Sequence, residues 1–136
     1  MYVPLDMHSY YSFLSSPASV EDLVGAASRF GMPGVAITDY DGIYGAVPLY
    51  KAARKRGIKP ILGAELSLDN RSRIVLLIKD GVGYRNLSRL ITSLIDRPEG
   101  ILRLALAGHC EGLVCLSGCR RGPVATIPIF INCVPA

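Results

Sequence analysis

The sequence of 136 residues has no apolar run long enough to cross a membrane as a helix. It also has no basic segment followed by a long apolar core at its start, where Met1 is followed by Tyr2-Val3-Pro4-Leu5-Asp6, so a secretory signal is not expected. Its four cysteines form no Cys-x-x-Cys pair and lie in the last fifth of the chain, a spacing that is poor for a zinc site. We therefore expect a cytoplasmic protein without a membrane segment or a cysteine-bound zinc ion.

Apolar residues are abundant and occur in short runs that alternate with helical patterns. Hydrophobic residues make up 50% of the chain, which suits an α/β fold with buried parallel strands, and the length is enough for one modest core. The expected order is strand, helix, strand, helix, strand, strand, helix, helix, strand, at residues 2–5, 20–30, 35–38, 46–56, 59–68, 73–78, 84–95, 101–107 and 112–117. This order predicts an α/β fold with right-handed crossovers and an open or barrel-like sheet.

Side chains that can bind a metal ion follow three of the expected strands. Asp6 and His8 follow the first strand, Asp39 follows the second, and Glu65 follows Leu62 in the third. The ends of successive strands are where alternating strand–helix folds place active sites. Imidazole and carboxylate groups suit zinc, manganese or iron, and such ions activate water for attack on phosphate esters. In the alternative interpretation His8 is a structural hydrogen-bond donor, and Glu65 either caps backbone N–H groups or pairs with a basic neighbour.

Basic residues are concentrated in the second expected helix. The net charge is +4, and Lys51, Arg54, Lys55 and Arg56 lie close together. We expect these residues to point outward, with Val47, Leu49, Tyr50 and Ala53 inward. The basic residues form either a solvated helix face or a surface that contacts the phosphates of a nucleic acid.

Five ordered segments of the chain form a recognisable set. They include Leu5-Asp6-Met7-His8, Ile37-Thr38-Asp39-Tyr40-Asp41, Lys59-Pro60-Ile61-Leu62-Gly63-Ala64-Glu65, Gly83-Tyr84-Arg85-Asn86-Leu87 and Glu111-Gly112-Leu113-Val114-Cys115. Together they resemble the PHP domain, and more narrowly the N-terminal PHP domain of the bacterial DNA polymerase III α subunit. The last of them is most similar to the error-prone branch of that family. The resemblance implies a distorted β/α barrel with a cluster of divalent metal ions, zinc or manganese, at one end, and DNA or other replication subunits as partners.

The sequence departs from the family pattern at three ligand positions. Asp6 stands where active members have the first histidine, Ser15 where a loop carries aspartate, and Tyr40 where the second motif carries histidine, whereas His8 and Glu65 are kept. A neutral phenol is a poor metal ligand near neutral pH. We therefore expect a degenerate metal site made of His8, Glu65, Asp6 and Asp39.

The end of the chain does not continue the pattern. Residues 1–125 are expected to form the N-terminal part of a PHP domain, and residues 126–136 an apolar tail that is not native to the fold. We expect a truncated gene product, a partial barrel that self-associates through its unclosed sheet and that does not polymerise DNA by itself.

Three functions follow from these observations. The first is a domain that supports DNA replication without catalysis, and the second is a metal-dependent phosphoesterase or 3′–5′ exonuclease that acts on nucleic acid. The third is a small module that binds phosphate backbones through Lys51, Arg54, Lys55 and Arg56. The sequence leaves open whether the chain is an enzyme.

Overall fold

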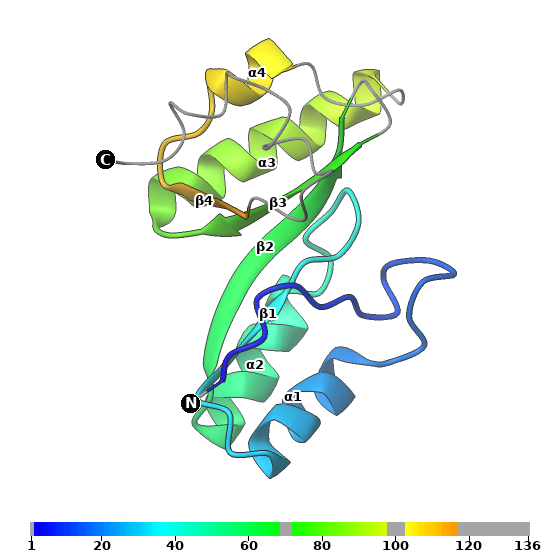
Figure 1. Ribbon diagram of the computed structural model, residues 1–136, viewed down its shortest axis with the longest axis vertical. Coiled ribbons are helices and arrows are strands. Elements are labelled where there is room, and N and C mark those ends of the chain that lie inside the picture. Colours follow the sequence, from blue (N-terminus) through cyan, green and yellow to red (C-terminus); the bar gives the residue numbers. More distant parts are fainter. Residues whose placement is uncertain (1, 69–71, 98–102, 117–136) are drawn as a thin grey trace.

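A computed structural model describes residues 2–68, 72–97 and 103–116. Within these residues, four strands form one mixed sheet in the order β1-β2-β3-β4, accompanied by four helices (Figure 1). The expected α/β class is confirmed. The elements are α1 (Val20–Arg29), β1 (Gly34–Ile37), α2 (Ala46–Arg56), β2 (Lys59–Ser67), β3 (Arg73–Ile78), α3 (Gly81–Asp96), α4 (Arg103–Ala107) and β4 (Leu113–Leu116).

The strand β2 is common to the two halves of the molecule. Its first residues pair in parallel with β1, from Gly34–Lys59 to Ile37–Leu62, and its later residues pair antiparallel with β3, from Gly63–Leu77 to Ser67–Arg73. Figure 1 shows α1, α2 and β1 around one end of β2, and α3, α4, β3 and β4 around the other end. Each half has its own apolar cluster, one centred on residues such as Leu49 of α2 and the other on residues such as Leu87 of α3.

Local sequence signals set the ends of the first two helices. Ser19 caps α1, because its hydroxyl accepts a hydrogen bond from Asp22 N while the Asp22 carboxylate accepts from Ser19. Gly57 ends α2 in the left-handed conformation, with φ of 66°, which a glycine adopts at little cost.

The inward face of α2 differs from the expected one. Leu49, Ala52 and Ala53 are buried, as expected for Leu49 and Ala53, but Val47 is 62% exposed and Tyr50 is 51% exposed. The small alanines lie where α2 packs closely against α1 and β2, and that contact leaves no room for larger side chains. The expectation that Val47 and Tyr50 point inward is therefore wrong.

The strand expected at residues 2–5 does not form, and the segment of residues 2–8 has no regular secondary structure. It lies beside β1, and Pro4 O and Met7 O accept hydrogen bonds from Ala36 N and Thr38 N. Pro4 has no N–H to donate to a ladder, so the segment remains irregular. It nevertheless follows β1 closely enough to bring Asp6 and His8 to the end of that strand.

The third helix begins earlier than expected. Asp80 caps α3 by accepting hydrogen bonds from Val82 N and Gly83 N, so residues 81–83, which precede the helix expected at 84–95, belong to its first turn. The fourth helix and the last strand are found at Arg103–Ala107 and Leu113–Leu116. The apolar tail at residues 126–136 lies outside the described residues.

Candidate metal centre

Asp6, His8 and Glu65 form a compact group of metal-capable side chains. One donor atom from each lies within 4.8 Å of the other two. His8 Nε2 is 2.8 Å from Glu65 Oε2 and 3.9 Å from Asp6 Oδ1. Thr38 at the end of β1 donates a hydrogen bond to Asp6 Oδ1 over 2.8 Å, which holds the exposed Asp6 carboxylate toward His8.

The group lies where β2 changes its pairing partner. Glu65 follows the residues of β2 that pair with β1, and it forms a parallel bridge with Tyr40. The segment of residues 2–8 supplies Asp6 and His8 from the other side of β1. The centre therefore joins the two halves of the molecule.

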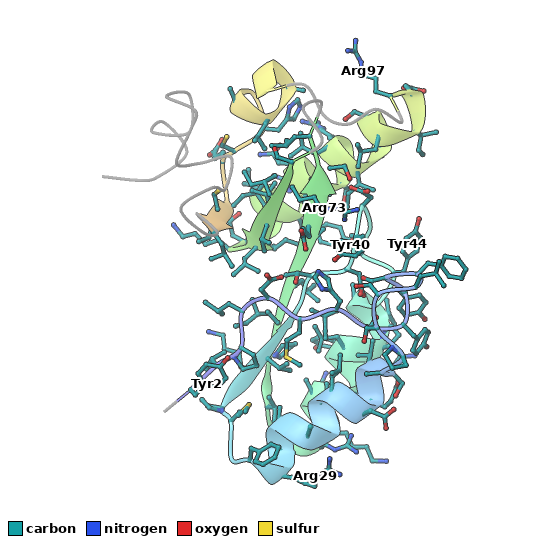
Figure 2. The ribbon with its side chains drawn as sticks, turned by 45° about the vertical axis from the view of Figure 1, so that its right-hand side comes forward. Tyr2, Arg29, Tyr40, Tyr44, Arg73 and Arg97 are labelled. Carbon is teal, nitrogen blue, oxygen red and sulfur yellow. The ribbon has the colours of Figure 1, made fainter. Side chains whose placement is uncertain are left out.

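An aromatic side chain covers His8. The rings of His8 and Tyr40 have centroids 4.4 Å apart, and the guanidinium carbon of Arg73 lies 3.8 Å from the Tyr40 ring centroid. Figure 2 shows Arg73 and Tyr40 next to each other in the middle of the molecule. The contact between Arg73 and the Tyr40 ring is a cation–π interaction, so the Tyr40 ring lies between an imidazole and a guanidinium group.

The three positions that depart from the family pattern are close to one another. Asp6 contacts His8, Tyr40 stacks on His8, and the Ser15 and Tyr40 hydroxyl oxygens are 3.5 Å apart. Sequence reasoning missed Arg73, which begins β3 and has no metal-binding chemistry of its own. Its contact with Tyr40 depends on the pairing of β2 with β3.

The structure places Asp39 outside this group. Its side chain is buried, and its carboxylate accepts hydrogen bonds of 2.7 Å from Ser9 N, Ser9 Oγ and Ser12 Oγ. These bonds fix the loop that follows His8. The sequence signal for this role was the pair of serines near His8, which sequence reasoning did not single out.

The donor set of the centre fits a divalent cation. One imidazole nitrogen and two carboxylate oxygens are hard or borderline ligands that bind such ions. In the described part of the chain, the three donors make up a single site and not a cluster of several sites. The Tyr40 ring lies against His8, at the position where the family pattern carries a histidine, and a neutral phenol is a poor replacement for an imidazole ligand.

The basic residues of α2 are all exposed. No ion pair within residues 2–68, 72–97 and 103–116 involves Lys51, Arg54, Lys55 or Arg56. The Arg54 guanidinium donates to the Tyr50 hydroxyl over 3.3 Å. Arg56 lies against α1, with a guanidinium nitrogen 3.7 Å from where a Cβ on Gly25 would be. None of the described helices is both long and apolar enough to span a membrane.

Sequence comparison identifies the family and its relatives. The chain matches the PHP domain over residues 4–132. It is 36% identical to the error-prone DNA polymerase of Symbiobacterium thermophilum, over 93% of this chain and 14% of that protein. It is 38% identical to the DNA polymerase III subunit alpha of Chlamydia pneumoniae, over 91% of this chain and 12% of that protein. The chain thus spans 12–14% of the length of these relatives.

Solved structures share the fold. A putative metal-dependent phosphoesterase from Bifidobacterium adolescentis superposes with a TM-score of 0.51 at 22% identity, over 67% of this chain and 32% of that one. An amidohydrolase from Chromobacterium violaceum superposes with a TM-score of 0.58 at 24% identity, over 81% of this chain and 37% of that one. These likenesses confirm the expected partial PHP-type barrel.

The resemblance to DNA polymerase III α subunits, including the error-prone branch, is confirmed by the relatives. The matched range covers most of the chain and contains the centre of Asp6, His8 and Glu65. The chain belongs to the PHP domain family.

Proposed function

We propose that this chain is a PHP domain of a DNA replication protein and that its role is structural rather than catalytic. It acts in the cytoplasm, with DNA or other replication subunits as partners. Similarity to DNA polymerase III α subunits supports the link to replication. The observation that carries the non-catalytic role is the packing of Tyr40 between His8 and Arg73. The Tyr40 ring, with its centroid 4.4 Å from that of the retained imidazole, leaves the centre short of ligands.

The retained donors would hold at most one ion, which we propose to be zinc or manganese. Asp6, His8 and Glu65 would bind it. Asp39 would join them only by giving up its bonds to Ser9 and Ser12, so we propose a structural role for it in the absence of metal. A bound ion would supply Lewis acidity toward a phosphate oxygen. The other residues orient the donors: Thr38 holds Asp6, and Tyr40 limits access to His8.

Metal content and phosphate-ester hydrolysis test this proposal together. Purified chain is dialysed against zinc or manganese, its metal content is measured, and hydrolysis of a generic aryl phosphate is followed. We expect less than one ion per chain and no hydrolysis that depends on the centre. Stoichiometric metal lost in His8→Ala, together with hydrolysis lost in the same variant, would contradict the supporting role.

The position of Tyr40 offers a matched pair of variants. Tyr40→His places an imidazole next to His8, and we expect it to increase metal uptake because imidazole is a much better ligand than phenol. Tyr40→Phe keeps the ring without adding a donor, and metal uptake should stay at the level of the unchanged chain. Equal uptake by both variants would show that Tyr40 does not limit the centre.

A second candidate is a metal-dependent phosphoesterase or 3′–5′ exonuclease. The grouping of Asp6, His8 and Glu65 within 4.8 Å favours it. The hydrolysis assay above separates the two candidates, with a single-stranded oligonucleotide as an additional substrate.

A third candidate function is the binding of phosphate backbones by α2. The observation that favours it is that four basic side chains are exposed and form no ion pair within the described residues: Lys51, Arg54, Lys55 and Arg56.

A further inference from the structure

Exposed tyrosines extend from the loop after His8 to the start of α2. The rings of Tyr10 and Tyr11 have centroids 4.6 Å apart, and those of Tyr11 and Tyr44 are 6.2 Å apart. Tyr10 is 45% exposed and Tyr44 is 67% exposed, whereas Tyr11 packs partly against the core of α1 and α2. Tyr11 therefore supports two aromatic rings that face solvent.

Exposed aromatic and basic side chains follow on α2, which begins two residues after Tyr44. Tyr50 and Lys51 lie four and three residues before Arg54, so each of them lies beside Arg54 on the helix surface. The hydrogen bond from Arg54 to the Tyr50 hydroxyl confirms that these two side chains meet. Tyr10, Tyr11, Tyr44, Tyr50, Lys51 and Arg54 together are called the aromatic–basic stripe below.

The composition of the aromatic–basic stripe matches a particular ligand. Aromatic rings with exposed faces stack with unpaired bases, and neighbouring cations contact the phosphates between those bases. The bases of a duplex are already stacked on one another, so a duplex cannot use the tyrosine rings in this way.

We propose that the aromatic–basic stripe binds single-stranded nucleic acid, with bases stacked on Tyr10 and Tyr44 and phosphates bound by Lys51 and Arg54. This inference rests on the proposed binding of phosphate backbones by α2 and adds that the strand must be single. The stripe begins at the loop that leaves His8, so a strand bound there passes close to the centre. A protein partner would use the tyrosines but would not require the two cations.

Fluorescence anisotropy with labelled oligonucleotides tests the inference. A single strand of about 15 nucleotides, as DNA and as RNA, is compared with a hairpin duplex of similar length and charge. We expect the single strand of either sugar to bind more tightly than the duplex. Tyr44→Ala and Tyr10→Ala should each weaken single-strand binding by at least about fivefold, the lower end for loss of one stacked base. Phe30→Ala is the aromatic control, because Phe30 is exposed at the opposite end of α1, next to the Arg29 labelled in Figure 2.

Salt dependence tests the cationic half of the aromatic–basic stripe. Lys51→Gln and Arg54→Gln should each lower the slope of log affinity against log salt by about 0.7, the value for one phosphate contact on a single strand. Lys79→Gln serves as the control, because Lys79 is exposed between β3 and α3 in the other half of the molecule. The inference would be overturned if duplex and single strand bound equally, with binding unchanged by the tyrosine variants but weakened by the two glutamine variants. That result would still support the proposed binding of phosphate backbones by α2. If neither nucleic acid bound at low salt, both the single-strand inference and the proposed phosphate-backbone binding would be overturned. A protein would then be the expected partner of this surface.

Discussion

The Asp39 carboxylate organises the loop that leads from His8 to the exposed tyrosines. It is 1% exposed and accepts hydrogen bonds from Ser9 N, Ser9 Oγ and Ser12 Oγ. A further hydrogen bond, donated by Tyr40 N to Ser12 Oγ, connects this loop with Tyr40, whose ring lies against His8. The loop and the centre are therefore positioned by one buried carboxylate.

Asp39→Asn is expected to lower the free energy of unfolding by about 2–3 kcal/mol, because an amide nitrogen replaces one acceptor and the charge that strengthens the bonds is lost. Urea denaturation followed by circular dichroism measures the change. Ser15→Ala is the control, since Ser15 is exposed in the same loop and its hydroxyl oxygen lies 3.5 Å from that of Tyr40. Unchanged stability with reduced metal uptake in Asp39→Asn would instead assign Asp39 to the ligands.

The residues of the centre could be predicted from sequence only in part. Asp6, His8 and Glu65 stand out because they are metal-capable and follow apolar runs, and the structure brings these three together. The contact between Arg73 and Tyr40 depends on how β2 pairs with β3, and strand register is not visible in the local pattern of either strand. The burial of Asp39 likewise depends on how the loop folds back.

The first turn of α3 packs directly against the turn before β4. A Cβ added to Gly83 would lie 1.8 Å from Gly112 O, so Gly83→Ala requires the backbone to move. We expect it to lower the free energy of unfolding by about 2–3 kcal/mol, a typical cost of overpacking, and to weaken the attachment of β4. Thermal unfolding measures the loss. A shift of less than a degree would mean that the turn at Gly112 adjusts freely.

Gly81→Ala is the matched control for this contact. Gly81 lies in the same helical turn, but the nearest atom to an added Cβ is Arg85 Nη1 at 4.0 Å. Alanine also favours a helix more than glycine does. Gly81→Ala should therefore leave stability unchanged or raise it slightly, and a loss equal to that of Gly83→Ala would remove steric overlap as the cause.

The capping box of α1 makes part of the stability depend on pH. Hydrogen bonds from the Ser19 side chain and then from its backbone hold the pKa of Asp22 below its usual range. A lowered folded-state pKa contributes stability that is complete above the unfolded pKa of about 4 and is lost as the pH falls through the folded value. Asp22→Asn should thus be less stable than the unchanged chain at pH 7, with the difference vanishing near pH 2. Thermal midpoints across this range provide the measurement, with Glu21→Gln in the same turn as control. A difference that stays constant with pH would exclude the carboxylate as its source.

Elements were easier to predict than their faces and ends. The apolar periodicity and the glycines that follow α1 and α2 identify both helices, and β-branched runs identify β1 and β3. The segment of residues 2–8 is irregular because Pro4 lacks an N–H. An apolar run predicts a strand there, and composition alone does not show that one missing donor prevents it. Periodicity predicts Tyr50 on the inward face of α2, because the spacing of apolar residues does not distinguish a tyrosine in the core from one on the surface.

At the scale of the whole molecule, the sheet has an edge that is open to pairing. Within the described residues, β4 pairs with β3 on one side and with no strand on the other, and Val114 on β4 is 45% exposed. At the opposite end, the segment of residues 2–8 and α1 border a cavity of about 510 Å³ lined mainly by apolar side chains such as Leu5, Leu23 and Phe30. Open strand edges and exposed apolar surfaces favour association between copies.

We therefore predict that the chain self-associates when expressed alone. Size-exclusion chromatography with light scattering should show species larger than a monomer, in proportions that grow with concentration. Val114→Lys should reduce their proportion, because a charge on an edge strand opposes pairing with another edge. Val47→Lys is the control, because it introduces the same charge at another exposed valine. Val47 lies on α2, is 62% exposed and is remote from the sheet edge. A monodisperse monomer at all concentrations would contradict the prediction, and an equal effect of both variants would assign the change to net charge rather than to the β4 edge.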